Sequence, residues 1–528
     1  MRLLPSEDCR HLDIEEQVMK RRCILIALIL ILLLTFAVVI QARKEPEMDT
    51  VRPAVVAGKF YSEAPEILKG SIAGFLEDGS PVTAPNPLAL ILPHAGYIYS
   101  GQIAADGYNQ ARGNVYDTVV ILGTNHTSPH FNKIALYPGD GFATPLGVAR
   151  VDKTIVEALK ESSPDCVFTS SPHQNEHSVE VQVPFIQVVF PKAKIVPVII
   201  GTPDARLCDR FGQALGKVLK GKKALIVASS DLSHYPSHDD AVAVDQPILA
   251  AIATLDPQRV QETVQAQMNK GIANLHTGAC GEGPILTAMA AAKVMGAKGG
   301  KVVSYANSGD IAIGDRTRVV GYGAVALTAD EPKPAAAAKP PSGTADELQQ
   351  ADKKALLSLA RKTINRYLTT ETVPLARGFS PAVQEFRGVF VTLKKFGNLR
   401  GCIGRLIPEA PLGQLVGAMA IQSALNDHRF RPVTIAEMKD IEIELSVLTP
   451  MKTVPKAEDI VVGRDGVLLQ KGRAGAVFLP QVATEQGWSR EEMLDQLCLK
   501  AGLAEGSWRT GAEFQTFQAI VFHESEFK

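Results

Sequence analysis

The sequence lacks the cysteine pattern of a disulfide scaffold or a zinc ribbon. Its seven cysteines are scattered over 528 residues, are odd in number and form no CxxC pair, whereas both architectures need closely spaced pairs. It also lacks an excess of charge of either sign, since 55 Lys and Arg stand against 56 Asp and Glu, a formal net charge of -1. A protein that binds nucleic acid over a broad surface needs a positive excess, so nucleic acid is not an expected partner.

The repeated long apolar runs of a multi-span transporter are missing too. Hydrophobic residues make up 46% and charged residues 21% of the chain, which is typical of a globular protein. The length exceeds what one compact core needs, and it predicts two or three domains. A stretch rich in Pro and Ala at residues 329–347 predicts a linker. It separates residues 51–328 from residues 348–528, and we find no internal repeat relating the two parts.

One long apolar run is present near the start of the chain. Residues 23–40 carry no charge, and as a helix they would extend about 27 Å, close to the thickness of a bilayer core. We therefore predict a polar tail at 1–22 and one transmembrane helix at 23–41. The alternative is a cleaved signal peptide, but no small-residue cleavage site follows the run. Three basic residues, 20–22, precede it, and the positive-inside rule then predicts a single-pass membrane protein whose folded parts are extracytoplasmic.

Short β-branched runs in residues 51–328 predict the strands of a sheet. They alternate with helix-like stretches such as 152–162 and 243–265, which indicates an α/β fold in which helices cover a sheet. The runs lie at residues 88–92, 118–123, 194–200, 224–229 and 319–327.

Side chains that can bind a metal follow three of these runs. His94, His126, Asp231 and His234 each come shortly after a predicted strand, although a lone histidine there is more often a hydrogen-bonded turn residue. Ligands of open α/β sheets bind at the C-terminal ends of strands, so we expect these side chains in one crevice. Cys280, flanked by glycines, is either a small buried hydrophobe or a thiol that a ligand can approach. Two imidazoles and a thiolate suit a divalent transition metal with one open position, and Asp231 and His234 would then handle protons or orient ligands.

The segment HQNEH, residues 173–177, gives a rival metal signal. It matches H-x-x-E-H, a motif in which both histidines bind zinc from one helical turn. Pro184 follows closely, so the helix would be short, and no third ligand is evident. A zinc protease is the alternative that this motif leaves open.

Five segments of residues 51–328 resemble the motifs of the Memo family in order and spacing: PHAGYIYSG, LGTNH, NEHSVEVQVPF, SSDLSHY and TGACGEGPI. The resemblance implies a fold similar to class III extradiol ring-cleaving dioxygenases, whose non-haem iron is held by two histidines and a carboxylate. In Memo-like proteins a cysteine occupies the place of that carboxylate. Catechol cleavage is therefore not simply inherited, and the resemblance implies a metal site more firmly than a reaction.

The same resemblance implies roles for individual residues. The matching metal ligands are His94, His126 and Cys280, with iron as the first expectation and copper or zinc as alternatives. The NEHSVEVQVPF segment belongs to another family motif, which weakens the protease interpretation. The candidate catalytic residues are Asp231, His234 and His177.

Residues 348–528 predict a second, α+β domain. Residues 346–368 have the apolar spacing of an amphipathic helix, and residues 386–408 read as a β-hairpin. Residues 441–450 alternate like a half-exposed strand that places Glu442 and Glu444 on one face. These two carboxylates either line a solvated sheet face or form a general acid–base pair.

Three segments here, LRGCIGRL, NDHRFRPV and LPQVATEQGW, resemble the AMMECR-one domain, which implies an α+β fold and no established activity. Cys402 and His428 could pair as nucleophile and base. In the structural alternative, glycines let a strand pack closely while Cys402 fills the core. Arg400, Arg429 and Arg431 could also form an anion-binding patch. The motif residues are Arg400, Gly401, Cys402, Gly404 and His428.

Fused Memo and AMMECR-one domains resemble the bacterial AmmeMemoRadiSam proteins, which implies a shared pathway with a radical S-adenosylmethionine protein as a partner. The sequence thus predicts a membrane-anchored, metal-dependent redox enzyme related to dioxygenases, with an unknown small-molecule or peptide substrate. A metallohydrolase would use the same residues. The competing class is a non-catalytic scaffold module that binds a peptide or an anion.

Overall fold

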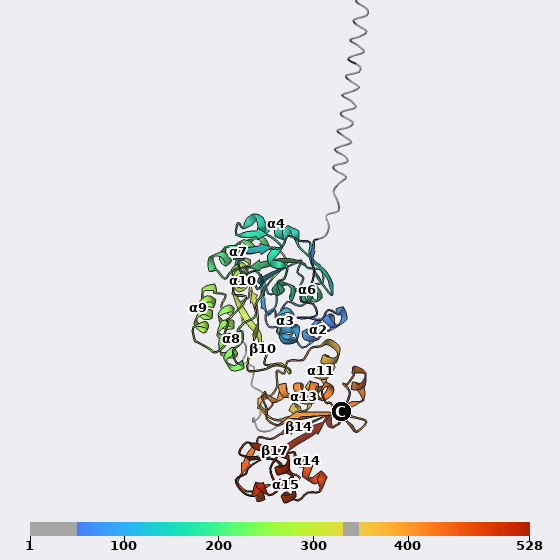
Figure 1. The fold of residues 1–528 in the computed structure, drawn as a ribbon. Coiled ribbons are helices and arrows are strands. Elements are labelled where there is room, and N and C mark those ends of the chain that lie inside the picture. Colours follow the sequence, from blue (N-terminus) through green and yellow to red (C-terminus); the bar gives the residue numbers. More distant parts are fainter. Residues whose placement is uncertain (1–18, 20–49, 331–347, 528) are drawn as a thin grey trace, which may run out of the picture. The chain divides into compact units, whose positions relative to one another are not determined.

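A computed structural model describes residue 19 and residues 50–330 and 348–527. Residues Val51–Lys528 form one compact unit, in which two parts of different architecture follow one another (Figure 1). We call residues 50–330 the N-terminal part and residues 348–527 the C-terminal part.

A mixed eight-stranded sheet lies at the centre of the N-terminal part. Its four middle strands, β2, β9, β3 and β8, run parallel to one another, while β11 and β4 pair antiparallel on either side of them. Each of the five predicted β-branched runs forms one strand of this sheet. In spatial order the strands are β10 (Gly299–Asn307), β11 (Gly321–Thr328), β2 (Ala89–Leu92), β9 (Ala224–Ser229), β3 (Thr118–Thr124), β8 (Lys194–Ile200), β4 (Ile134–Leu136) and β7 (Cys166–Phe168).

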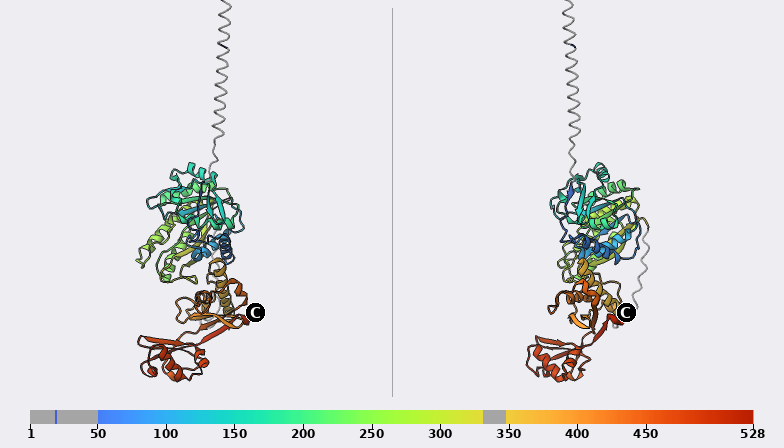
Figure 2. Two further views of the ribbon diagram at one scale, coloured as in Figure 1. Left: turned by 45° about the vertical axis from the view of Figure 1, so that its right-hand side comes forward. Right: turned by 90° about the vertical axis from the view of Figure 1, so that its right-hand side faces the viewer.

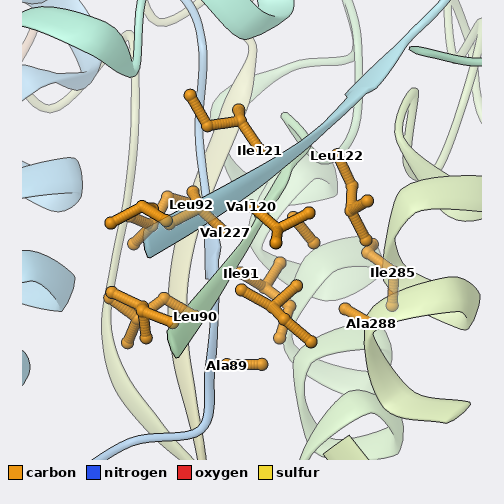
Figure 3. Close-up of a cluster of buried hydrophobic side chains, with 14 of the residues drawn as sticks. Ala89, Leu90, Ile91, Leu92, Val120, Ile121, Leu122, Val227, Ile285 and Ala288 are labelled. Carbon is orange, nitrogen blue, oxygen red and sulfur yellow. The ribbon is translucent and has the colours of Figure 1, made fainter. Parts of the chain in front are cut away.

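Helices cover both faces of this sheet. α3 packs with α2 and α6 on one face, and α10 packs with α7 on the other (Figure 1). Because both faces are buried, the middle strands are apolar throughout rather than alternating: Ile91 and Leu122 face Ile285 of α10, while Leu90 projects to the opposite side (Figure 3). The helices are α2 (Pro65–Glu77), α3 (Tyr97–Ala111), α4 (Lys153–Ser162), α5 (His177–Glu180), α6 (Val183–Val189), α7 (Ala205–Leu219), α8 (His238–Ala253), α9 (Pro257–Met268) and α10 (Glu282–Met295).

The stretch 243–265, predicted as helix-like throughout, is divided between α8 and α9. Leu255 has a φ of 60°, a left-handed backbone conformation that ends a helix. Asp256 then caps α9 with its side chain, and Pro257 occupies the first helical position. The apolar spacing continues across this break, so the spacing alone did not predict that the helix is divided.

A small three-stranded sheet flanks the large one. Its first strand pairs with the middle strand in parallel, and the other two form an antiparallel hairpin. The strands are β1 (Val51–Arg52), β5 (Gly141–Thr144) and β6 (Gly147–Arg150).

The C-terminal part contains two antiparallel four-stranded sheets with separate hydrophobic cores. Figures 1 and 2 show the first in orange and the second in red, and the red C-terminal strand β19 joins the orange sheet. The first sheet has the order β13 (Asn398–Arg405), β12 (Val389–Lys395), β14 (Ile441–Leu448) and β19 (Ala519–His523). The second has the order β15 (Lys452–Val454), β18 (Glu513–Phe517), β16 (Gly466–Lys471) and β17 (Ala474–Phe478). The helices are α11 (Gln350–Thr370), α12 (Pro381–Gln384), α13 (Leu412–Leu425), α14 (Pro480–Gln486) and α15 (Arg490–Lys500).

The carboxylates of β14 form separate ion pairs. Glu444 lies 2.7 Å from Lys394 on the neighbouring strand, and Glu442 lies 3.4 Å from His523. Partly exposed ion pairs of this kind are usual on a solvated sheet face. The structure therefore favours that interpretation over an acid–base pair.

The predicted membrane helix needs correction. Residues 23–41 lie outside the described residues, and among the helices that the structure does describe, none is both long and apolar enough to cross a bilayer. α11 has 21 residues, but its charged residues, among them Lys354, Arg361 and Arg366, exclude it from a membrane core. A transmembrane helix is thus no part of the described fold, and this finding contradicts the predicted single-pass membrane location.

Candidate metal centre

Three of the predicted ligand and acid–base residues follow adjacent parallel strands. His94 comes two residues after β2, Asp231 two after β9 and His126 two after β3. Because β2, β9 and β3 are parallel neighbours, their C-terminal ends meet at one edge of the sheet. The structure brings His94, His126 and Cys280 together there, with one potential ligand atom from each lying within 4.8 Å of the others.

The loop before α10 brings Cys280 to this edge. The Cys280 amide donates to the Asp231 carbonyl at 3.3 Å, and the Thr124 hydroxyl donates to the Cys280 carbonyl at 2.9 Å. A Cβ on Gly281 would collide with the Ser229 carbonyl and with Ser230, so the loop can approach the strand ends only with glycine there. The Cys280 thiol consequently lies 3.3 Å from His94 Nε2.

The hydrogen bonds around His94 determine which of its nitrogens is free. Ser229 Oγ donates to the Ser178 carbonyl at 2.7 Å and accepts from Gln182 Nε2 at 3.0 Å. Its remaining lone pair faces His94 Nδ1 at 3.0 Å, so Nδ1 carries the proton. His94 Nε2 is left with a lone pair directed at the Cys280 side, as a metal ligand requires.

Glu176 fixes His126 in the same way. One carboxylate oxygen accepts from His126 Nδ1 at 2.9 Å and the other from the His126 amide at 2.6 Å. Burial by itself would raise the pKa of Glu176, but the hydrogen bonds from His126 and Ser178 lower it to about 2. The ionised carboxylate therefore holds the proton on Nδ1 and leaves His126 Nε2 free to bind a metal.

Replacing Glu176 with glutamine is expected to weaken metal binding by roughly 10–100-fold without unfolding the protein, as loss of such an orienting partner does in other metal sites. The amide can accept one of the two His126 hydrogen bonds but presents a donor to the other. Competition with a chromophoric chelator measures the change. Glu444→Gln, in the C-terminal part, is the matched control, and equal affinities for the two variants would contradict the orienting role.

Arg52 anchors the segment that carries Glu176. Its guanidinium donates to the His173 and Glu176 carbonyls at 2.5 and 2.7 Å and pairs with Glu180 at 2.6 Å. Glu180 is fully buried and also accepts from the Tyr61 hydroxyl at 2.7 Å. Nothing in the sequence pattern indicates this network, because Arg52 and Tyr61 lie more than a hundred residues from the segment that they bind.

The remaining candidate catalytic residues surround the three ligand candidates. Burial raises the pKa of Asp231 to about 7, although the His94 amide donates to its carboxylate at 2.8 Å. The His177 ring stacks on His126 with 4.6 Å between centroids. Burial lowers the pKa of His177 and of His234 to about 4. The imidazoles of His177 and His234 are therefore neutral at neutral pH, whereas the Asp231 carboxyl group titrates close to that pH.

The protonation states of the ligand candidates follow from burial as well. Burial lowers the pKa of His94 well below its usual value, and the neighbouring His126 and His177 add to the shift. Burial raises the pKa of the Cys280 thiol well above its usual range, and Asp231 adds to it. Without a cation this thiol stays protonated, so a metal that binds here must displace its proton.

The HQNEH segment does not form the zinc-protease arrangement. His173 lies in a 3-10 turn, Ser171–His173, while His177 begins α5, so one helical turn does not carry both. His173 is buried, and its Nε2 lies 3.2 Å from the Ala135 carbonyl. The structure instead groups His126, Glu176 and His177 as a second set of potential ligands that shares His126. Glu176 is more simply explained as the group that orients His126.

The glycines of the AMMECR-one motif pack as the structural alternative expects, whereas Cys402 is only half-buried and does not fill the core. The Cys402 thiol lies 3.2 Å from the Thr392 hydroxyl across the hairpin, whereas His428 is exposed. A Cβ on Gly401 would collide with the Ser423 carbonyl, and one on Gly404 with the Phe390 ring. Close strand packing therefore accounts for both glycines, and a Cys402–His428 catalytic pair has no support in these contacts.

The proposed arginine patch is largely neutralised. Arg400 pairs with Glu437 at 3.1 Å and Arg429 pairs with Asp427 at 2.7 Å. The second pair lowers the pKa of Asp427. Arginines that are already paired with carboxylates make a poor anion site, so the patch gains no support.

Comparisons with known proteins agree with the two resemblances. A family described as "Memo-like protein" matches residues 52–326, and one described as AMMECR1 matches residues 357–522. A "MEMO1 family protein" of Aquifex aeolicus is 36% identical over 277 residues, 52% of this chain and 97% of that protein. One from Desulfurococcus amylolyticus is 36% identical over 291 residues, covering 52% and 98% of the two chains. The crystal structure of an uncharacterized protein from Pyrococcus horikoshii is 38% identical and covers 32% of this chain and 90% of that one, with a TM-score of 0.30.

Proposed function

The chain belongs to the Memo-like protein family, and from this premise we propose that it binds one divalent transition metal through His94, His126 and Cys280 and acts as a metal-dependent oxidoreductase on a small molecule. Iron is the first candidate for the metal, with copper and zinc as alternatives.

The observation that supports this proposal most strongly is the position of the three ligand atoms and of the groups that orient them. Ser229 and Glu176 occupy the Nδ1 atoms of His94 and His126, so both Nε2 atoms keep a lone pair that can bind a cation. The Cys280 thiol lies beside His94 Nε2, and its ionisation needs a nearby positive charge. Two imidazoles and one thiolate leave coordination positions for water or a substrate. The residues present therefore fit a bound metal.

A bound redox-active metal would supply electron transfer or oxygen chemistry that no side chain of the chain can perform. The protein's own contribution is to hold protons close to that position. Asp231, with a pKa of about 7, can both donate and accept a proton near neutral pH. His177 and His234 are neutral at that pH and can accept a proton in turn.

The scaffold alternative gains less support from the geometry. Among the described residues, the hydrogen bonds and ion pairs of the His94, His126 and Cys280 side chains involve no lysine or arginine. An anionic group such as a phosphorylated side chain is normally bound by such cations. A metallohydrolase would use the same ligands, so the identity of the metal separates it from the redox enzyme.

The test is to purify the full chain without oxygen, determine its metal by plasma mass spectrometry and follow oxygen consumption with a panel of catechols. Iron or copper at about one ion per chain, with substrate-dependent oxygen uptake, supports the oxidoreductase. Zinc together with ester or amide hydrolysis would favour the hydrolase. Absence of any metal after anaerobic reconstitution would contradict the proposal.

Metal affinity is expected to rise by about tenfold per pH unit between pH 6.5 and 8.5, because the metal displaces one proton from Cys280. The sign follows from the raised pKa of the thiol, which keeps it protonated over this range. His94, with its lowered pKa, is neutral there and adds nothing to the slope. Zinc titration against a chelator measures the dependence. Cys280→Ser should flatten the slope, and an unchanged slope would contradict thiolate ligation.

A further inference from the structure

The C-terminal part docks on the N-terminal part through opposite charges. α11 lies beside α2 (Figure 1). The C-terminal side contributes three cations, Lys362, Arg366 and Arg377. The N-terminal side contributes three carboxylates, Glu77, Asp78 and Asp106. Such charge complementarity is typical of a surface that recognises a partner.

Asp106 is the centre of this contact. Its side chain has no solvent exposure, and Arg377 binds both of its oxygens, at 2.5 and 2.9 Å. The Ser80 amide donates to the same carboxylate at 2.8 Å. Arg377 also donates to the Asp78 carbonyl. An arginine that binds both oxygens of a buried carboxylate fixes orientation as well as proximity.

Groups without charge complete the surface. Ile311 of the N-terminal part packs with Val373 and Ile421 of the C-terminal part in a small buried cluster. The buried Gln414 amide donates to the carbonyls of Gly309 and Ile311 at 2.7 and 2.9 Å. The contact thus combines a small apolar cluster with hydrogen-bonded polar groups, as stable protein interfaces do.

We propose that this surface is a binding interface in its own right, so that residues 348–527 bind residues 50–330 without residues 331–347 that connect them. The partner that the acidic surface fits is an AMMECR1-type domain that presents cations in the positions of Lys362, Arg366 and Arg377, whether attached or on a separate chain. The covalent connection then only raises the local concentration of the partner.

The experiment replaces residues within 331–347 of the full chain by a specific protease site, cleaves the folded protein and follows the fragments by size-exclusion chromatography. We expect the two fragments to elute together at micromolar concentration. Arg377→Ala should weaken the association by roughly 100-fold, because it leaves the buried Asp106 carboxylate without its partner. The proposal would be overturned if the two fragments of the cleaved protein, without any interface substitution, separated at micromolar concentration.

Two further variants keep the test interpretable if Arg377→Ala misfolds. Lys362→Ala removes a partly exposed cation that pairs with Asp78, and it should weaken association more at low than at high salt. Arg473→Ala removes an exposed arginine outside the interface and should elute like the unaltered protein. Equal behaviour of Lys362→Ala and Arg473→Ala at low salt would count against a charge-driven surface.

Discussion

Replacing Cys280 with serine is expected to weaken metal binding so far that the variant loses its metal on desalting. The protein supplies three ligand atoms within 4.8 Å, and the thiol is the one that can bring a negative charge to the cation. Its loss should cost more than the roughly 10–100-fold typical of an orienting partner. His126→Ala should have the same consequence, because it removes the imidazole ligand that Glu176 orients. Metal content of each full-length variant, determined after anaerobic reconstitution and desalting, measures the effect.

Matched controls separate ligand loss from damage to the fold. Cys166→Ser changes a half-buried cysteine of β7, and His130→Ala removes an exposed histidine. Neither residue belongs to the groups of potential ligands, so both variants should keep the metal. Retention of metal by Cys280→Ser and His126→Ala would place the site elsewhere.

Replacing Arg52 with alanine is expected to destabilise the N-terminal part by about 3–5 kcal/mol, the usual cost of leaving one member of a buried ion pair without its partner. Glu180 would remain fully buried with two backbone amides and Tyr61 as its partners but no cation. The His173 and Glu176 carbonyls would lose their donor as well. Loosening of that segment should also lower metal affinity through Glu176.

Urea denaturation followed by far-ultraviolet circular dichroism measures this destabilisation. Both tryptophans, Trp488 and Trp508, lie in the C-terminal part, so tryptophan fluorescence follows that part separately and should change little. Arg210→Ala is the control, because Arg210 forms an exposed pair with Asp165 and such pairs contribute little. Equal transitions for Arg52→Ala and Arg210→Ala would contradict a stabilising role for the buried network.

The strands and their order along the chain were predictable because a strand buried on both faces leaves a continuous apolar run. The position of the ligand candidates followed from the same pattern, since His94 and His126 come directly after such runs. The break between α8 and α9 was not predictable from apolar spacing. It depends on the backbone of Leu255 and the cap formed by Asp256, which are local features.

The groups that orient the ligands could not be predicted from the sequence, for a different reason. Glu176 reaches His126 across 50 residues of sequence, and Arg52 reaches Glu180 across 128. No spacing rule connects residues so far apart. The HQNEH motif even suggested the wrong pairing, because His173 and His177 share a motif but not a helix. Hydrogen-bond partners of this kind emerge only from the fold.

The central claim is that one metal is held by two imidazoles and one thiolate, and X-ray absorption spectroscopy of the zinc-reconstituted full chain tests it most directly. We predict one sulfur neighbour at about 2.3 Å and nitrogen neighbours at about 2.0–2.1 Å. In variants measured at high protein concentration without desalting, the weakly bound zinc should lack the sulfur neighbour in Cys280→Ser and one imidazole in His94→Ala. A spectrum with only nitrogen and oxygen neighbours in the unaltered protein would contradict the proposed centre.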